Sequence, residues 1–164
     1  MSTPTHLAAL EDIQDSLKWL REVVTGLPVQ ALDWVPAAGA NPITVLASHA
    51  IPSTLYWAEA GSGKSPSHRA YVENHRRAAF ETNGLTSEDL LARIEQAEAA
   101  VEAALRDGRE EHLVERFSLD DEPDEAAVSG ATCLLHGASH LREHVGQAAL
   151  TRDFWLALSA GSRR

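Results

Sequence analysis

The chain has 164 residues, of which 44% are apolar and 23% charged, a balance typical of one folded domain and too hydrophobic for a disordered chain. Its 24 acidic and 14 basic residues give a net charge of −10, which repels phosphate backbones and anionic lipids. No apolar run reaches the roughly 18 residues of a membrane span. We therefore expect a single domain over residues 1–164 that has neither nucleic acid nor a membrane as a partner.

The chain has one cysteine, Cys133, so it cannot form an internal disulfide. Its first residues lack the basic and then apolar segments of a targeting signal. Both features predict a cytoplasmic location. Because no activating partner for a thiol is evident, we interpret Cys133 as a buried packing residue rather than a nucleophile.

Four segments space their apolar residues by three or four positions, as amphipathic helices do, and no other segment alternates convincingly as a strand. The first helix is predicted over residues 6–26. The second is expected to begin with Asn41 as N-cap and Pro42 at the first helical position. Pro52 predicts a kink in it just after His49. The inward stripe of this helix consists of Leu46, His49, Ser53 and Tyr56.

A polar, glycine-containing stretch over residues 61–84 predicts a long connection with a helical piece near residues 71–80. The third helix follows, capped by Thr86 or Ser87 and ended by Gly108. A connection of this length indicates a crossover between helices rather than a tight turn.

Residues 109–126 are predicted to form a loop, whose acidic run at 120–125 is expected to be solvated. The fourth helix is predicted over residues 127–152 and is followed by a short aromatic tail at Phe154 and Trp155. The expected fold class is all-α, a four-helix bundle with long crossover connections, and the core of such a bundle is a common place for a metal.

Three of the eight histidines, His136, His140 and His144, lie four residues apart on the predicted fourth helix. Four residues of α-helix give about 40° of rotation and about 6 Å of rise, so neighbouring members can direct their rings at one ion. All three cannot share it, because His136 and His144 are about 12 Å apart along the axis. Only one neighbouring pair, His136 with His140 or His140 with His144, can bind a single ion, and the third ligand must then come from another helix.

His49 is the one histidine on the inward stripe of a second predicted helix. Three imidazoles leave coordination positions open, which is typical of a reactive site for zinc, nickel or a similar ion. The alternative is that His49 is a hydrogen-bonded core residue with no metal.

Two segments carry a resemblance to a known family, which covers nearly the whole chain. NPITVLASH leads to His49, with Tyr56 and Trp57 after it, and HLREHVGQ begins at His140; Trp34 and Pro36 in the first loop complete the pattern. The chain resembles the DinB-like superfamily of metal-binding bundles, also called the YfiT or maleylpyruvate-isomerase-like group.

The resemblance implies that the metal ligands are His49, His140 and His144. Val145 stands where the family often has arginine, whereas Gly146 and Gln147 keep the family pattern. It also implies an enzyme that uses a low-molecular-weight thiol such as mycothiol or bacillithiol, together with an electrophile, in an S-transfer or isomerisation, and it implies a homodimer. The alternative is a metal-binding stress or accessory protein without turnover.

Secondary roles remain for several residues around these ligands. His136 is expected to support the site or simply to pack, and Tyr56 and Trp57 to line a substrate pocket or to pack in the core. Gly137 and Gly146 weaken a helix, which suggests close approach of a neighbouring helix at each. The other histidines are expected on the surface: His6, His68, His75 and His112.

One rival motif is HLREH, which matches the HxxEH zinc-peptidase pattern with Glu143 as a general base. The rival is weak because no glutamate follows His144 to complete the ligand set. Glu143 also points about 100° away from His144 on the helix, so we expect it to face solvent.

Overall fold

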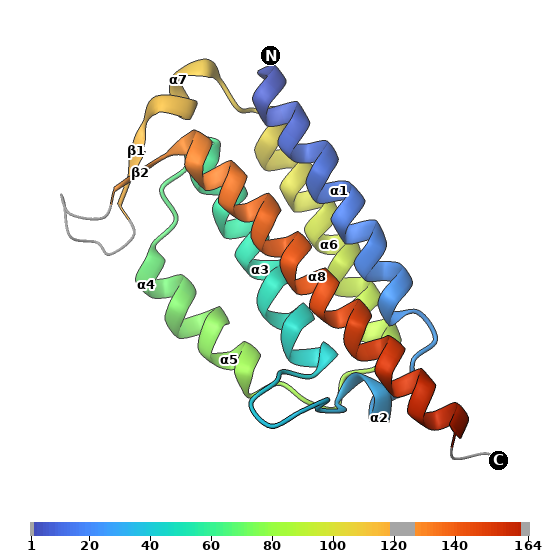
Figure 1. Cartoon of the computed structure of the whole chain (residues 1–164). Coiled ribbons are helices and arrows are strands. Elements are labelled where there is room, and N and C mark those ends of the chain that lie inside the picture. The colour runs from blue at the N-terminus through green and yellow to red at the C-terminus, as the bar shows by residue number, and fades with distance from the viewer. Residues whose placement is uncertain (1, 119–126, 162–164) are drawn as a thin grey trace.

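The computed structural model describes residues 2–118 and 127–161, and four long helices dominate it (Figure 1). These helices are α1 (Pro4–Val24), α3 (Ile43–Gly61), α6 (Ser87–Arg106) and α8 (Gly130–Gly161). The short elements are α2 (Val29–Leu32), α4 (His68–Tyr71), the π-helical turn η1 (Val72–Arg76), α5 (Arg77–Phe80), α7 (Glu110–Val114), β1 (Arg116–Phe117) and β2 (Val128–Ser129). The predicted all-α class is confirmed. None of the described helices is long and apolar enough to cross a membrane.

The four long helices pack as a bundle in which α8 contacts both α3 and α1, and α6 contacts the same two helices. Helices α1 and α8 run in one direction and α3 and α6 in the other (Figure 1). Because α3 and α6 are parallel, residues 62–86 must return along the bundle between them. This is the predicted crossover, and it carries α4, η1 and α5, of which η1 and α5 pack against α3.

The core consists of the apolar stripes that the periodicity predicted. Burying one large apolar side chain contributes roughly 1.5–3 kcal/mol, so these stripes fix the helices relative to one another. The largest fully buried apolar side chains are those of Ile13, Leu17, Leu20, Leu32, Ile43, Leu90, Ile94, Leu105, Leu134 and Leu141. The scaffold around the inward histidine of α3 is therefore a densely packed one.

The predicted cap of the third helix is confirmed and that of the second is wrong. Thr86 forms a capping box with Asp89, in which the Thr86 hydroxyl accepts from the Asp89 amide at 3.1 Å and the Asp89 carboxylate accepts from the Thr86 amide at 2.9 Å. Asn41 does not cap α3. Pro42 has an extended backbone with ψ of 164°, so it is itself the N-cap and the first helical residue is Ile43.

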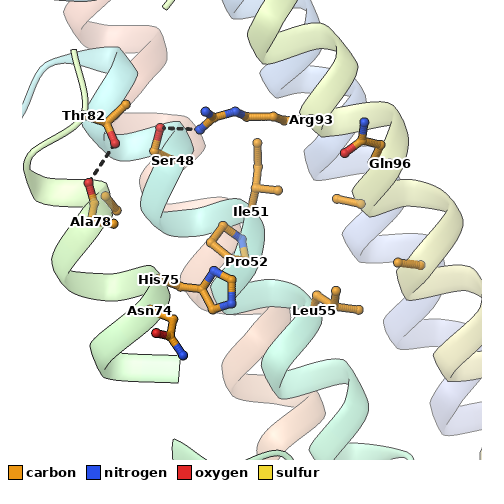
Figure 2. A pocket seen from close by; sticks show the side chains of 13 residues that line it. Ser48, Ile51, Pro52, Leu55, Asn74, His75, Ala78, Thr82, Arg93 and Gln96 are labelled. Atoms are coloured by element: carbon orange, nitrogen blue, oxygen red, sulfur yellow. Dashed lines mark hydrogen bonds between the residues drawn. The ribbon is translucent and has the colours of Figure 1, made fainter. Parts of the chain in front are cut away.

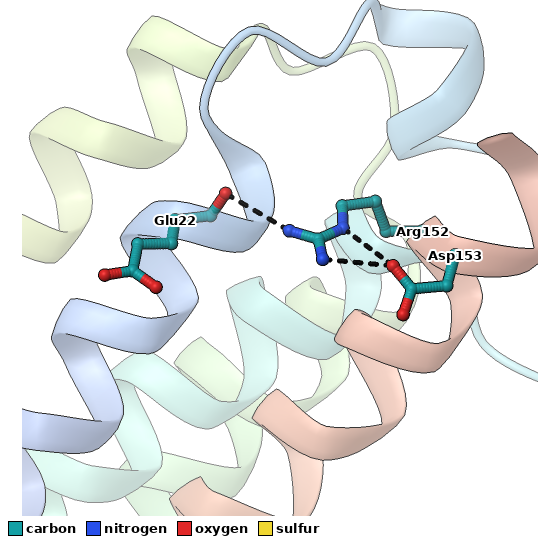
Figure 3. A network of polar contacts seen from close by, with 3 residues as sticks. All are labelled: Glu22, Arg152 and Asp153. Carbon is teal, nitrogen blue, oxygen red and sulfur yellow. Dashed lines mark hydrogen bonds and ion pairs between the residues drawn. The ribbon is translucent and has the colours of Figure 1, made fainter.

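Helix α8 is longer than predicted, because residues 153–160 contain no glycine or proline that would end it. The expected aromatic tail is therefore helical. Just before this extension, Arg152 donates to the Glu22 carbonyl, in the last turn of α1, at 3.5 Å (Figure 3). It also donates to the Asp153 carboxylate at 3.0 and 3.1 Å. The cation thus stabilises the C-terminal end of α1, where helix carbonyls are unpaired.

The expected loop at 109–126 is also partly wrong, because α7 and β1 lie in it and β1 pairs with β2 in an antiparallel two-stranded sheet. Two residues per strand are too few to show an alternating pattern in the sequence. The acidic run at 120–125 lies outside the described residues.

Two of the histidines expected on the surface are buried. The ring of His6 is fully buried, with Nδ1 2.7 Å from the Thr3 hydroxyl and Nε2 3.0 Å from the Gly61 carbonyl. His112 is 9% exposed, and its Nδ1 accepts from the Arg109 amide at 3.1 Å. The sequence carried a signal for His6, since it precedes Leu10 by four residues and so continues the inward stripe of α1.

Candidate metal centre

Two neighbouring helices bring three histidines together at one level of the bundle. His49 lies in the second turn of α3, and His140 and His144 lie on successive turns of α8. The side chains face one another because α3 and α8 are in contact and each histidine sits near the seam between them. All three are half-buried, so the cluster is held by the core and is still open to small molecules.

The ring nitrogens of the three histidines converge. The Nε2 atoms of His140 and His144 are 3.1 Å apart, and one nitrogen from each of the three rings lies within 4.8 Å of the others. Two imidazole nitrogens bound to one zinc ion at about 2.0–2.1 Å stand roughly 3–3.4 Å apart, so this spacing fits a shared ion. The structure therefore brings together the three histidines that the family resemblance selected, and their role as metal ligands stays a prediction.

Hydrogen bonding within the protein does not account for these histidines. The Nδ1 atoms of His49 and His140 are buried and have no hydrogen-bond partner among the described residues. A buried polar atom without a partner costs free energy, so such atoms call for a ligand or water. This observation disfavours the alternative in which His49 is a hydrogen-bonded core residue, and the donor set fits a borderline divalent ion such as zinc or nickel.

The electrostatics of the cluster lower the pKa values of His49 and His140. Burial, followed by the proximity of His144 and of Arg76, lowers the pKa of His49 to about 4. Burial and the same neighbours, with His49 and His136 in addition, lower the pKa of His140 to about 4. A histidine must be unprotonated to bind a metal, so both rings are ready ligands at neutral pH.

The crossover segment covers one side of the cluster, which the sequence did not predict. The Phe80 ring of α5 lies 5.4 Å from the His49 ring, measured between centroids. Arg76, one turn earlier, is close enough to depress the pKa values of His49 and His140. In the sequence, Arg76 and Phe80 stand four residues apart in a polar stretch. This spacing places them on one face of a helix but does not predict which part of the protein that face packs against.

The aromatic residues beyond His49 differ in their surroundings. Tyr56 is 4% exposed and stacks on Tyr71 with centroids 4.6 Å apart, so its role is core packing. Trp57 is half-buried, with its ring 4.5 Å from that of His136. His136 is exposed and stacks on His140 at 5.5 Å, and it lies outside the group of three converging rings.

Polar side chains on α8 contact the His144 ring at Nδ1, the nitrogen that points away from His140. Its Nδ1 lies 3.0 Å from the Gln147 side-chain oxygen, and the Gln147 amide nitrogen donates to the Glu143 carboxylate at 3.4 Å. With Nδ1–H donating to Gln147, the free lone pair of His144 is on Nε2, the atom that faces His140. Glu143 is exposed, as expected, and contributes no oxygen to the cluster, which leaves the peptidase pattern without its base.

The lone cysteine lies fully buried on α8, and burial raises the pKa of its thiol to about 11. Cys133 therefore stays protonated at neutral pH and is not a nucleophile, which is the interpretation that the sequence favoured.

Comparison with known proteins agrees with the fold and the motif. Residues 12–148 match the family model described as the DinB superfamily. The chain belongs to the DinB superfamily. A conserved protein from Enterococcus faecalis has a similar solved structure, with a TM-score of 0.71 and 17% sequence identity over 93% of this chain and 96% of that one. At this identity the likeness shows the fold alone. No curated protein matches the chain.

Proposed function

We propose that this DinB-superfamily protein is a metal-dependent enzyme that joins a low-molecular-weight thiol to an electrophile, or isomerises a substrate through such a thiol. The observation that carries the proposal is the cluster of three half-buried imidazoles with no carboxylate among the described residues that form it. A divalent ion on three neutral ligands keeps its full charge and an open position, where it would lower the pKa of a thiol.

The residues around the cluster support an anionic nucleophile. Arg76 adds a positive charge beside His49 and His140, which favours a thiolate over a thiol in the same place. Gln147 orients His144, and the Phe80 ring packs beside the His49 ring. Because the described residues that form the cluster include no carboxylate and Cys133 is buried, the proposal assigns the nucleophile to a small molecule.

Metal content tests the premise. Protein purified without an affinity tag should contain about one zinc or nickel ion per chain by elemental analysis. His49→Ala, His140→Ala and His144→Ala should each lose it. His136→Ala is the matched control, since His136 lies on the same helix one turn away and outside the cluster, and it should retain the metal. Equal retention in all four variants would contradict the assignment.

Thiol binding and conjugation test the chemistry. Protein loaded with Co²⁺ should develop a thiolate charge-transfer band when 2-mercaptoethanol is added, and the band should be missing in His144→Ala. Metal-loaded protein should also accelerate conjugation of mycothiol, bacillithiol or glutathione to monochlorobimane. A bound metal without either response would favour the second candidate, a metal-binding accessory protein without turnover.

A further inference from the structure

A cavity of about 540 Å³ lies between α3, α6 and the η1–α5 segment (Figure 2). Ser48, the residue before His49, lines it, whereas none of the three clustered histidines does. Small-molecule sites in proteins have volumes of about 300–1,000 Å³. The cavity is therefore large enough for a ligand and separate from the candidate metal centre.

Much of the cavity wall is apolar, and the cavity exists because several of the residues that line it have small side chains. Ile51, Pro52 and Leu55 of α3 form one wall. Facing them are four alanines of α5 and α6, Ala78, Ala79, Ala97 and Ala100. Larger residues at these positions would fill the cavity, so the sequence keeps an apolar space that could hold the body of a small organic molecule.

One end of the cavity carries a cation. Arg93 reaches from α6 across to α3, where its guanidinium donates to the Ser48 hydroxyl at 3.2 Å (Figure 2). In the described part of the chain, no carboxylate forms an ion pair with Arg93. The Asp89 carboxylate, one turn earlier, accepts from the Thr86 amide and hydroxyl, both at 2.9 Å, and Arg93 is close enough to help lower the pKa of Asp89 without forming an ion pair with it. The guanidinium thus has donors left for a ligand.

The charge of the cavity is opposite to that of the protein. The chain carries 24 acidic residues, yet no aspartate or glutamate is among the described residues that line this space, where Arg93 and His75 are the ionisable groups. Asn74 and Gln96 add amide donors at the rim (Figure 2). An arginine that forms no ion pair with a described carboxylate and lies at one end of an apolar cavity matches the chemistry of a carboxylate ligand, which a guanidinium can bind through two hydrogen bonds.

We propose that this cavity is a binding site for a small carboxylate with an apolar body, whose carboxylate binds Arg93 and whose body lies against Ile51, Pro52 and Leu55. The site is independent of the thiol chemistry proposed above, because it uses neither the histidines nor a metal. A ligand there bridges α3 and α6 next to the helix turn that carries His49.

Octanoate is the probe, and octylamine, with the same chain and the opposite charge, is the matched ligand control. Isothermal titration should show saturable binding of octanoate to the wild-type protein and weaker binding of octylamine. Arg93→Met keeps an apolar stem and removes the charge, and it should weaken octanoate binding by about 10–100-fold, as expected when a charged hydrogen bond is lost. Arg106→Met, an exposed arginine on the same helix, should leave octanoate binding unchanged.

Ala100→Met tests the location, because a longer side chain there occupies the apolar space and should block octanoate, with a thermal melt to confirm folding. Four outcomes would overturn the proposal: no saturable octanoate binding, equal binding of octylamine, full affinity in Arg93→Met, or full affinity in folded Ala100→Met. Arg93 is exposed, so its variant tests the proposal even if Ala100→Met does not fold.

Discussion

The contact between Gln147 and His144 predicts that zinc affinity depends on a side chain outside the three-histidine cluster. The Gln147 oxygen lies 3.0 Å from His144 Nδ1 and fixes the tautomer whose Nε2 lone pair faces His140. Loss of such an outer partner typically weakens metal binding by about 10–100-fold. Because Gln147 is exposed, water can partly replace it, so we expect the lower end for Gln147→Ala, about tenfold or about 1.4 kcal/mol.

The assay is a competition titration of zinc between the protein and a chromogenic chelator. Alanine is the best helix former and position 147 is exposed, so Gln147→Ala should fold as the wild type does. Gln147→Glu should act in the opposite direction, because a carboxylate is a stronger acceptor for the imidazole N–H and raises the basicity of the ring.

Glu143→Ala is the matched control, since Glu143 reaches His144 only through Gln147 and by a long 3.4 Å hydrogen bond. It should change the affinity little. The reasoning would be refuted by an unchanged affinity in Gln147→Ala or by an equal loss in Glu143→Ala.

Three further results are expected. His6→Ala should lower the free energy of unfolding by about 3 kcal/mol in urea titrations, because it removes two buried hydrogen bonds and leaves a cavity, while the metal content should not change. Burial holds the pKa values of His49 and His140 at about 4, below the 6.5 of an unfolded histidine. The free energy of unfolding of the metal-free protein should therefore be highest above pH 6.5 and fall as the pH drops towards 4. The double variant His49→Phe, His140→Phe should lose part of this pH dependence. Gly137→Ala should weaken zinc binding in the chelator assay, whereas Gly146→Ala, whose added Cβ has no atom closer than 4.0 Å, should not.

The features that the sequence predicted correctly are those set within one helix. The spacing of His140 and His144 depends only on the rise and rotation of α8, and the apolar stripes of α1 and α6 follow the same periodicity. The approach of His49 depends in addition on how α3 packs against α8. Its position on the inward stripe made that approach plausible, and the family pattern selected it.

The features that the sequence did not predict depend on tertiary contacts or on weak local signals. Phe80 and Arg76 lie in a connection whose polar composition gives no direction for its packing, yet they cover His49. The end of α8 was misplaced because it is an exposed extension with no apolar stripe to bury. His6 was misplaced although it continues the α1 stripe, because its polar partner, the Gly61 carbonyl of α3, and the space left by Gly108 come from positions far away in the sequence.

Gly137 shows how a residue that is unfavourable for its own helix can set the geometry of a site. A Cβ at this position would stand 2.9 Å from the Trp57 Cβ, closer than side-chain carbons approach in real structures. The backbones of α3 and α8 therefore lie at a separation that only glycine permits, and His140 follows Gly137 by three residues on nearly the same face of α8. Glycine within a helix costs about 0.5–1 kcal/mol relative to alanine.

The close approach that Gly137 allows brings the ring centroids of His140 and His49 to 5.0 Å. The expected loss of zinc affinity in Gly137→Ala therefore comes from a changed distance between α3 and α8 and not from any missing ligand. Gly146 was expected to allow a similar approach and does not, because its nearest neighbour is the flexible tip of Trp19. Helix-weakening glycines thus identify close contacts only where the facing position, here Trp57, presents its Cβ to them.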